Sequence, residues 1–176
     1  MKDQIKSKLN KIYEIHDIRC NQKYDEILPY SVHLKSVVYH ANVFIEHIKE
    51  EDREDVLIAA AGHDLIEDAR LTYNDIVNKY NKKVADIIYC CTDEKGRTRE
   101  ERHSEKYYNE LKENRLAVYV KICDLMSNIN YSLLRKSSMY DKYKNDFEKI
   151  KNHLYIKGEY DDMWYVLEFY LRKEDE

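Results

Sequence analysis

The sequence holds very few of the residues that make tight turns, with three Gly and one Pro among 176 residues. A β-rich domain of this length needs a turn after nearly every strand, and Gly and Pro favour the backbone angles of such turns. Their scarcity argues against a many-turned β protein. We therefore expect an all-α fold.

The length and composition favour one domain spanning residues 1–176. A chain of this size buries a core without disulfide bonds or a structural metal, and neither an internal repeat nor a linker divides it. Its cysteines form no CxxC pair, which is typical of scattered reduced thiols. No apolar run approaches the roughly 18 residues of a membrane span. These features predict a cytoplasmic protein.

The charge balance bears on the partners. With 30 Lys and Arg against 34 Asp and Glu, the net charge of −4 gives no electrostatic reason to bind a nucleic-acid polymer. Local groups of basic residues remain able to hold a small phosphate ligand. We expect a small-molecule partner, with neither a nucleic-acid polymer nor a membrane.

Apolar residues recur at helical spacing along most of the chain. Residues 19–29 are expected to form a loop that ends at Pro29, after which Ser31 would cap a long helix. Another helix is expected to start after Asp52, and one to end near Cys91. The other expected helices cover residues 3–19, 31–50, 72–80, 98–112, 115–135, 139–155 and 161–171.

Residues 61–68, Ala-Gly-His-Asp-Leu-Ile-Glu-Asp, place four groups that bind metals or move protons within six positions. On a helix, His63 would stand one turn from Glu67. Asp64 would stand one turn from Asp68, so that all four side chains lean to one side. Three carboxylates beside an imidazole repel one another, and a divalent cation would neutralise them. Imidazole and carboxylate together suit manganese, iron or zinc.

Two further residues are predicted to complete a metal site. His33 lies in the first turn of the helix over residues 31–50, and Asp124 lies on the most apolar helix. We expect these two and the His63-Asp64 pair to bind one cation and to leave positions open for water and a phosphate oxygen. Water bound to such a cation loses its proton near neutral pH and attacks phosphorus.

Other polar residues near these positions have expected roles. Glu67 and Asp68 would position the water and pass protons as general base and acid. An isolated His-Asp pair is weak evidence, and the second one, His16-Asp17, is expected to fill the surface or the core because no partners accompany it. The candidate phosphate-binding residues are Lys23, Arg99, Lys121 and Lys144, for which a solvated surface position is as common.

The order of His33, His63-Asp64 and Asp124 resembles that of the HD-domain metal phosphohydrolases. A closer likeness, in length and along the whole chain, is to the hydrolase domain of RelA/SpoT proteins and to stand-alone small alarmone hydrolases such as the metazoan SpoT homologues. The segments that carry it are Pro29-Tyr30-Ser31-Val32-His33, His63 to Asp68, Thr92-Asp93 and Lys121-Ile122-Cys123-Asp124. This resemblance implies a single HD-domain helical bundle and manganese-dependent removal of the 3′-pyrophosphate from guanosine tetraphosphate or pentaphosphate.

The resemblance also implies roles for individual residues. The metal ligands are matched by His33, His63, Asp64 and Asp124, and the water-activating acids by Glu67 and Asp68. Lys23 falls at a lysine near the nucleotide, and Asn128 at an asparagine on the ligand helix. Arg99 and Lys144 fall where the family has Lys and Arg, which keeps the charge but not its shape.

Several departures from the family pattern concern the substrate more than the chemistry. Gln22 stands where an arginine is usual beside the nucleotide, Leu125 replaces a basic residue, and the loop before Pro29 lacks the usual Gly-Thr. With two fewer positive charges, a less charged nucleotide such as a nucleoside monophosphate or NADPH is the alternative substrate. A catalytically idle HD fold that binds a nucleotide or a protein partner is another alternative. Iron, zinc, nickel or cobalt could replace manganese, and the number of cations and subunits stays open.

Overall fold

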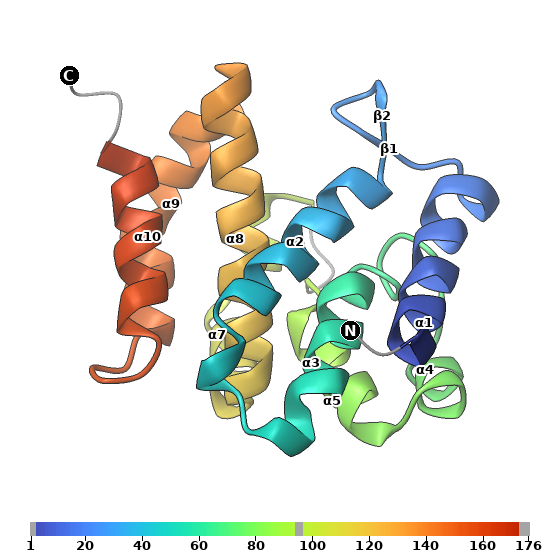
Figure 1. Ribbon diagram of the computed structural model, residues 1–176. Coiled ribbons are helices and arrows are strands. Elements are labelled where there is room, and N and C mark those ends of the chain that lie inside the picture. The colour runs from blue at the N-terminus through green and yellow to red at the C-terminus, as the bar shows by residue number, and fades with distance from the viewer. Residues whose placement is uncertain (1–2, 94–96, 173–176) are drawn as a thin grey trace.

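The computed structural model describes residues 3–93 and 97–172, apart from the side chains of residues 99 and 100. Helices form almost all of the regular structure in this part of the chain (Figure 1), which confirms the all-α prediction. They are α1 Asp3–Glu14, α2 Ser31–Val43, α3 Arg53–Gly62, α4 Tyr73–Lys79, α5 Lys82–Cys91, α6 Arg99–Arg102, α7 Glu105–Glu113, α8 Arg115–Arg135, α9 Met139–Leu154 and α10 Asp161–Arg172. None of the described helices is long and apolar enough to cross a bilayer.

Helix α8 runs through the middle of the bundle. It contacts α2, α3, α5, α7, α9 and α10, and Figure 1 shows it upright between α2 and α10. Asn114 starts the helix, because its side-chain oxygen accepts a hydrogen bond from the Ala117 backbone N–H at 3.1 Å. Lys136 ends it in the left-handed conformation, at φ 50°. The most apolar helix therefore occupies the core, as its sequence predicts.

Helices α2 and α3 pack on one side of α8 and carry small or branched apolar residues toward it. The run Ala59 to Ala61 at the end of α3 is completely buried, and such small side chains let neighbouring backbones approach closely. Gly62 follows for the same reason, since a Cβ there would lie 2.9 Å from Leu65 Cδ1 and 3.1 Å from Ile88 Cδ1. Close packing at this point fixes where the next residues, His63 and Asp64, begin.

The helix expected over residues 31–50 is shorter than predicted. It ends at Val43, and 3₁₀ turns follow at Ile45–His47 and Glu50–Asp52. Ile48 between them is extended and only 2% exposed, so the apolar spacing continues although the helix does not. Ser31 is not the cap that the sequence suggested. Instead, the Asp17 carboxylate accepts the Ser31 backbone N–H at 2.9 Å.

The segment expected as a loop contains a small antiparallel hairpin, β1 Lys23–Tyr24 and β2 Leu28–Pro29. Its turn places Asp25 and Glu26 at positive φ, 51° and 64°. The Asp25 carboxylate accepts hydrogen bonds from Tyr131 at 2.9 Å and from Arg135 at 3.2 Å. The hairpin is thus tied to the end of α8.

The helix expected over residues 98–112 is divided into α6 and α7. Thr98 and Glu101 form the predicted capping contacts, with 3.2 Å from the Glu101 backbone N–H to Thr98 Oγ1. The division comes at His103, after which Ser104 accepts the Tyr107 backbone N–H at 3.3 Å and starts α7. A second capping residue inside an otherwise helical pattern explains the break.

Candidate metal centre and active site

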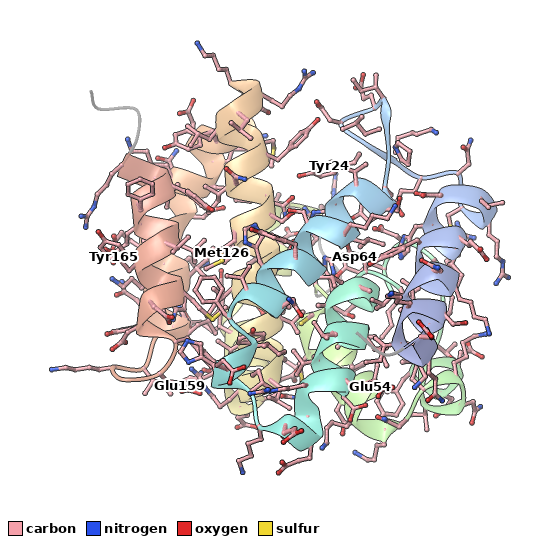
Figure 2. The ribbon with its side chains drawn as sticks, viewed as in Figure 1. Tyr24, Glu54, Asp64, Met126, Glu159 and Tyr165 are labelled. Carbon is pink, nitrogen blue, oxygen red and sulfur yellow. The ribbon has the colours of Figure 1, made fainter. Side chains whose placement is uncertain are left out.

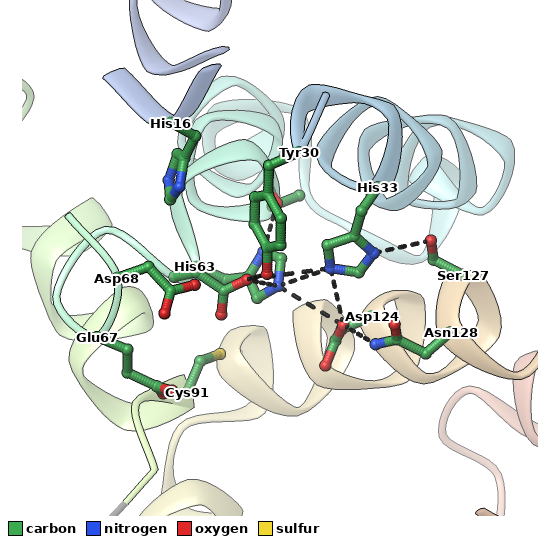
Figure 3. A network of polar contacts seen from close by, with 12 residues as sticks. His16, Tyr30, His33, His63, Glu67, Asp68, Cys91, Asp124, Ser127 and Asn128 are labelled. Carbon is green, nitrogen blue, oxygen red and sulfur yellow. Dashed lines mark hydrogen bonds and ion pairs between the residues drawn. The ribbon is translucent and has the colours of Figure 1, made fainter. Parts of the chain in front are cut away.

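Four candidate donors from three parts of the chain meet between α2, α3 and α8 (Figure 3). Nε2 of His33 lies 3.3 Å from Nε2 of His63, and Oδ1 of Asp124 lies 3.3 and 3.5 Å from these two nitrogens. Oδ2 of Asp64 lies 3.0 Å from Nε2 of His63 and 4.0 Å from that of His33. The predicted ligand residues are therefore brought together. The donor atoms of His33, His63 and Asp64 all lie within 4.8 Å of one another, which is close enough for one cation to bind them together.

The hydrogen bonds behind the two imidazoles suit a cation in front of them. Nδ1 of His63 lies 3.0 Å from the carbonyl oxygen of Ala60, which only accepts, so this nitrogen carries the proton. In the neutral ring, Nε2 would then offer a lone pair toward the cluster. Nδ1 of His33 lies 3.2 Å from the hydroxyl of Ser127. Two imidazole nitrogens and two carboxylate oxygens therefore converge, and this donor set fits a divalent cation.

Buried charges around the cluster balance one another. Lys121 Nζ lies 3.1 Å from Oδ2 of Asp124, and Asn128 donates a hydrogen bond to Oδ1 at 2.6 Å. Although burial alone would raise the pKa of Asp124, Lys121 and the two histidines hold it well below its usual value. Burial lowers the pKa of His63, but Asp64 and Asp124 raise it well above its usual value. The acids of the cluster are thus held as carboxylates.

The segment over residues 63–69 was expected to be helical, but it is not. Helix α3 ends at Gly62, and residues 63–69 form successive turns in which the Asp68 N–H still bonds to the Asp64 carbonyl at 2.9 Å. The Leu71 N–H reaches back to the Leu65 carbonyl at 3.1 Å, which curls the chain. Helical spacing nevertheless predicted correctly that the side chains of this segment gather at one place.

Glu67 and Asp68 lie beside the cluster, on the side away from Ser127 (Figure 3). Oε1 of Glu67 accepts the Asp93 backbone N–H at 2.6 Å, and Oδ2 of Asp68 accepts a hydrogen bond from Gln22 at 2.7 Å. Burial of its carboxyl group, opposed by the Asp93 N–H and reinforced by the charge of Asp64, raises the pKa of Glu67 to about 7. Burial and Asp64 also raise the pKa of Asp68. Glu67 is therefore suited to exchange protons near neutral pH.

A pocket of about 240 Å³ opens in front of these groups. Its polar wall includes Glu67, Asp93, Lys121 and Asn128, and Leu125 lies beside them. The lining residues from α7 and α9 are aromatic or aliphatic, and they are Tyr107, Tyr108, Leu111, Tyr143, Ile150 and Leu154. His103 belongs with the polar wall, because its Nε2 lies 3.0 Å from Oδ1 of Asp93. The pocket thus joins a charged end, suited to phosphate and metal, to an apolar end.

The candidate phosphate-binding residues fall in different places. Lys121 and Asn128 line the pocket, as expected for residues that share a face with Asp124. Lys23 on β1 and Lys144 on α9 are exposed and are not among its lining residues. Arg99 begins α6, and its side chain lies outside the described part of the structure.

Two tyrosines that we did not predict as site residues contact the candidate ligands. The Tyr30 hydroxyl donates to Oδ2 of Asp64 at 2.5 Å. Tyr24 stacks on the His33 ring at a centroid distance of 5.0 Å and donates to Asn128 at 3.1 Å. Figure 2 shows Tyr24 and Asp64 on the side of α8 opposite to Tyr165 of α10. Tyr30 has a sequence signal, since it precedes His33 by three positions, whereas Tyr24 lies in the hairpin that was expected to be a loop.

Comparisons with known proteins agree with this geometry at the level of the fold. No model of a protein family matches the chain, and no curated protein matches it significantly. Among solved structures, one match is described as a metazoan orthologue of SpoT that hydrolyses ppGpp and plays a role in starvation responses. It superimposes with a TM-score of 0.73 at 21% sequence identity and covers 96% of each chain. The chain therefore has the fold of this SpoT orthologue along nearly its whole length, which confirms the resemblance seen in the sequence.

Proposed function

We propose that the chain is a metal-dependent phosphohydrolase of nucleotides, and most specifically a guanosine 3′,5′-bis(diphosphate) 3′-pyrophosphohydrolase. The observation that carries this proposal is the convergence of two imidazole nitrogens and two carboxylate oxygens beside a pair of acids with raised pKa values. A shared fold with a protein described as hydrolysing ppGpp supports the same class of substrate.

The cation would be held by His33, His63, Asp64 and Asp124. Manganese is the proposed metal, and iron, zinc, nickel or cobalt also suits nitrogen and oxygen ligands. Bound there, the cation would lower the pKa of a water molecule and offset negative charge on the phosphoryl oxygens. Tyr30, Asn128 and Lys121 hold the two carboxylates in place for it.

Glu67 and Asp68 would handle the protons of hydrolysis. Oε1 of Glu67 is occupied by the Asp93 N–H, so Oε2 would accept a proton from the attacking water. The water oxygen forms a bond to the phosphorus of the 3′-diphosphate while the bond from phosphorus to the 3′ oxygen breaks. Oδ2 of Asp68 is occupied by Gln22, so Oδ1 would give a proton to the departing 3′ oxygen. The products are GDP and pyrophosphate.

Substrate recognition is the part of the proposal with the most alternatives. Lys121 and Asn128 would contact phosphate inside the pocket, with Lys23, Arg99 and Lys144 proposed at its edge. Leu125 lines the pocket without charge, and this favours a less charged nucleotide such as a nucleoside monophosphate or NADPH as the second candidate. That the chain forms one cytoplasmic domain acting on a small molecule stays a prediction.

The proposed function is tested by metal analysis followed by a screen for released phosphate and pyrophosphate. The substrates are ppGpp, NADPH and nucleoside and deoxynucleoside monophosphates, each with Mn²⁺. Pyrophosphate release from ppGpp would support the sharpest proposal, and release of phosphate only from NADPH or a monophosphate would support the second candidate. Bound metal without turnover of any substrate would overturn the enzyme proposal in favour of an idle binding fold.

Two variants connect turnover to the site. Asp64→Ala is expected to remove bound manganese and turnover together, because it deletes one of the four donors. Glu67→Gln is expected to keep the metal and to lose about 10² to 10⁴ in rate, the usual contribution of a general acid or base. Turnover by metal-free Asp64→Ala protein would sink the mechanism.

A further inference from the structure

His16 lies behind the proposed active site in a position that its expected role as filler does not explain. Its side chain is completely buried, and Nε2 has no hydrogen-bond partner among the described residues. Burying an imidazole nitrogen without a partner is unfavourable for folding. Its ring stacks on Tyr30 at a centroid distance of 5.2 Å, and Tyr30 in turn bonds to Asp64 (Figure 3).

A chain of two hydrogen bonds joins His16 to the acidic pair. Nδ1 of His16 lies 2.7 Å from Oε1 of Gln22, and Nε2 of Gln22 donates to Oδ2 of Asp68 at 2.7 Å. A carboxylate only accepts, so the Gln22 amide nitrogen faces Asp68 and its oxygen faces His16. Since that oxygen also only accepts, Nδ1 of His16 carries the proton.

The local backbone brings these residues together. Residues Ile15–Arg19 form a π-helical turn, in which the Cys20 N–H bonds to the Ile15 carbonyl at 2.9 Å. The Gln22 N–H then bonds to the His16 carbonyl at 2.9 Å, which turns both side chains toward the site. Such π turns inside or at the end of α-helices are frequent at functional sites.

We propose that His16 and Gln22 are positioning residues that hold the Asp68 carboxyl group for proton transfer. This role rests on the proposed hydrolase function. Asp68 lies on the turn after α3, and its carboxyl group accepts a hydrogen bond from Gln22. The His16 ring is completely buried and stacks on Tyr30, so the Gln22 amide that it orients would fix Oδ2 of Asp68 and leave Oδ1 for proton transfer. Gln22 thus serves the acid rather than the nucleotide phosphates.

Gln22→Met tests the proposal, because methionine has a similar length and forms no comparable hydrogen bond. Gln22 is only partly buried, so the variant is expected to fold. With Mn²⁺ and ppGpp, we expect kcat to fall about 10- to 100-fold, the usual cost of a misplaced catalytic group, while KM stays within about 2-fold. Gln4→Met, the same change at an exposed position of α1, is the control and is expected to match the wild type.

A double-variant comparison distinguishes two possible roles of Gln22, which are to position Asp68 or to contact the substrate. In the Asp68→Asn background, Gln22→Met is expected to cause no further loss of kcat, because the group it positions is already gone. A substrate contact would instead raise KM and lower kcat/KM by the same factor in both backgrounds. That result, or unchanged kcat in Gln22→Met, would overturn the positioning proposal while leaving the hydrolase function intact.

A readout that does not depend on turnover is the His16 tautomer, measured by long-range ¹H–¹⁵N NMR of the wild type and of Gln22→Met. The expected wild-type signal is a protonated Nδ1, and the preference is expected to weaken in the variant. A wild-type His16 protonated at Nε2 would overturn the proposal whatever the activity. Failure of the wild type to release pyrophosphate or phosphate from any nucleotide would instead overturn the proposed function, and the positioning role with it.

Discussion

Oδ2 of Asp64 accepts a hydrogen bond from the Tyr30 hydroxyl and also lies 3.0 Å from Nε2 of His63. A carboxylate that is oriented by a hydrogen bond binds metal better than a free one, and loss of such a partner typically costs 10- to 100-fold in affinity. We therefore expect Tyr30→Phe to weaken Mn²⁺ binding about 10- to 100-fold in calorimetric titration. Tyr39→Phe, at an exposed position of α2, is the control. Equal affinity in both variants would contradict the assignment.

The raised pKa of Glu67 has a consequence for stability. Burial lifts the pKa from its usual 4.5 to about 7 in the folded protein, so between these values the folded state keeps a proton that the unfolded state has released. The contribution of Glu67 to the unfolding free energy therefore decreases as pH rises through this window. In metal-free protein, we expect Glu67→Gln to gain stability relative to the wild type between pH 5 and pH 8, measured by urea unfolding. A constant difference would rule out the shifted pKa.

Side-chain chemistry let the sequence indicate His33, His63, Asp64 and Asp124, because imidazoles and carboxylates at those spacings have few other uses together. It did not indicate His16, since a lone histidine in a helix gives no sign that a π turn will direct it inward. The tyrosines of the site were hard to predict for another reason, because tyrosine is so common in this chain. With 17 of them in the chain, their identity alone cannot single out Tyr30.

At the scale of elements, the helices with clear ends were predictable. The range of α8 agrees with its prediction because Asn114 caps one end and apolar residues recur at helical spacing as far as Leu134. The end of α2 was missed because Ile48 keeps the helical spacing although it is buried from an extended segment. The β1–β2 hairpin was missed because its turn uses Asp25 and Glu26 at positive φ, where sequence rules expect Gly or Asn.

The cap of α8 makes a testable contribution to stability. Asn114→Ala removes the acceptor for the Ala117 N–H, and loss of an N-cap costs about 1 kcal/mol. We expect the unfolding free energy from urea titration to fall by about that amount. Asn109→Ala, at an exposed position inside α7, is the control and is expected to cause no loss, since alanine is the better helix former there. Equal stability of Asn114→Ala and the wild type would contradict a stabilising role of Asn114 as the helix cap.

At the scale of the whole molecule, the proposed cation would connect α2, the turn after α3, and α8. A ligand that binds only the folded state stabilises it, by about 2.7 kcal/mol at a hundredfold excess over Kd. For a chain of this size, we expect Mn²⁺ to raise Tm by about 5–10 °C in a thermal melt. The Glu67→Gln protein is expected to show the same rise in Tm with Mn²⁺. An equal rise in the Asp64→Ala protein would mean that the metal binds elsewhere.

The convergence of distant residues was the part of the site that local pattern alone could not determine. Helical spacing groups His63 with Asp64, but only packing of α2 and α8 against α3 brings His33 and Asp124 to them. Their residue types and places on predicted helices suggested that they would join the site, and the family resemblance implied the same four ligands. The structure gives a context to two residues at which the chain departs from the family pattern. Gln22 contacts Asp68, and Leu125 lies in the pocket wall.

The order of the four donors along the chain has a consequence during synthesis. A ribosome that has added residue 123 has supplied His33, His63 and Asp64 but not the last donor, Asp124. Helix α8, which carries that donor, is also the element against which most other helices pack. A nascent chain would therefore gain its central helix and the last of the proposed metal ligands together, so products terminated before residue 124 are expected to lack the proposed activity.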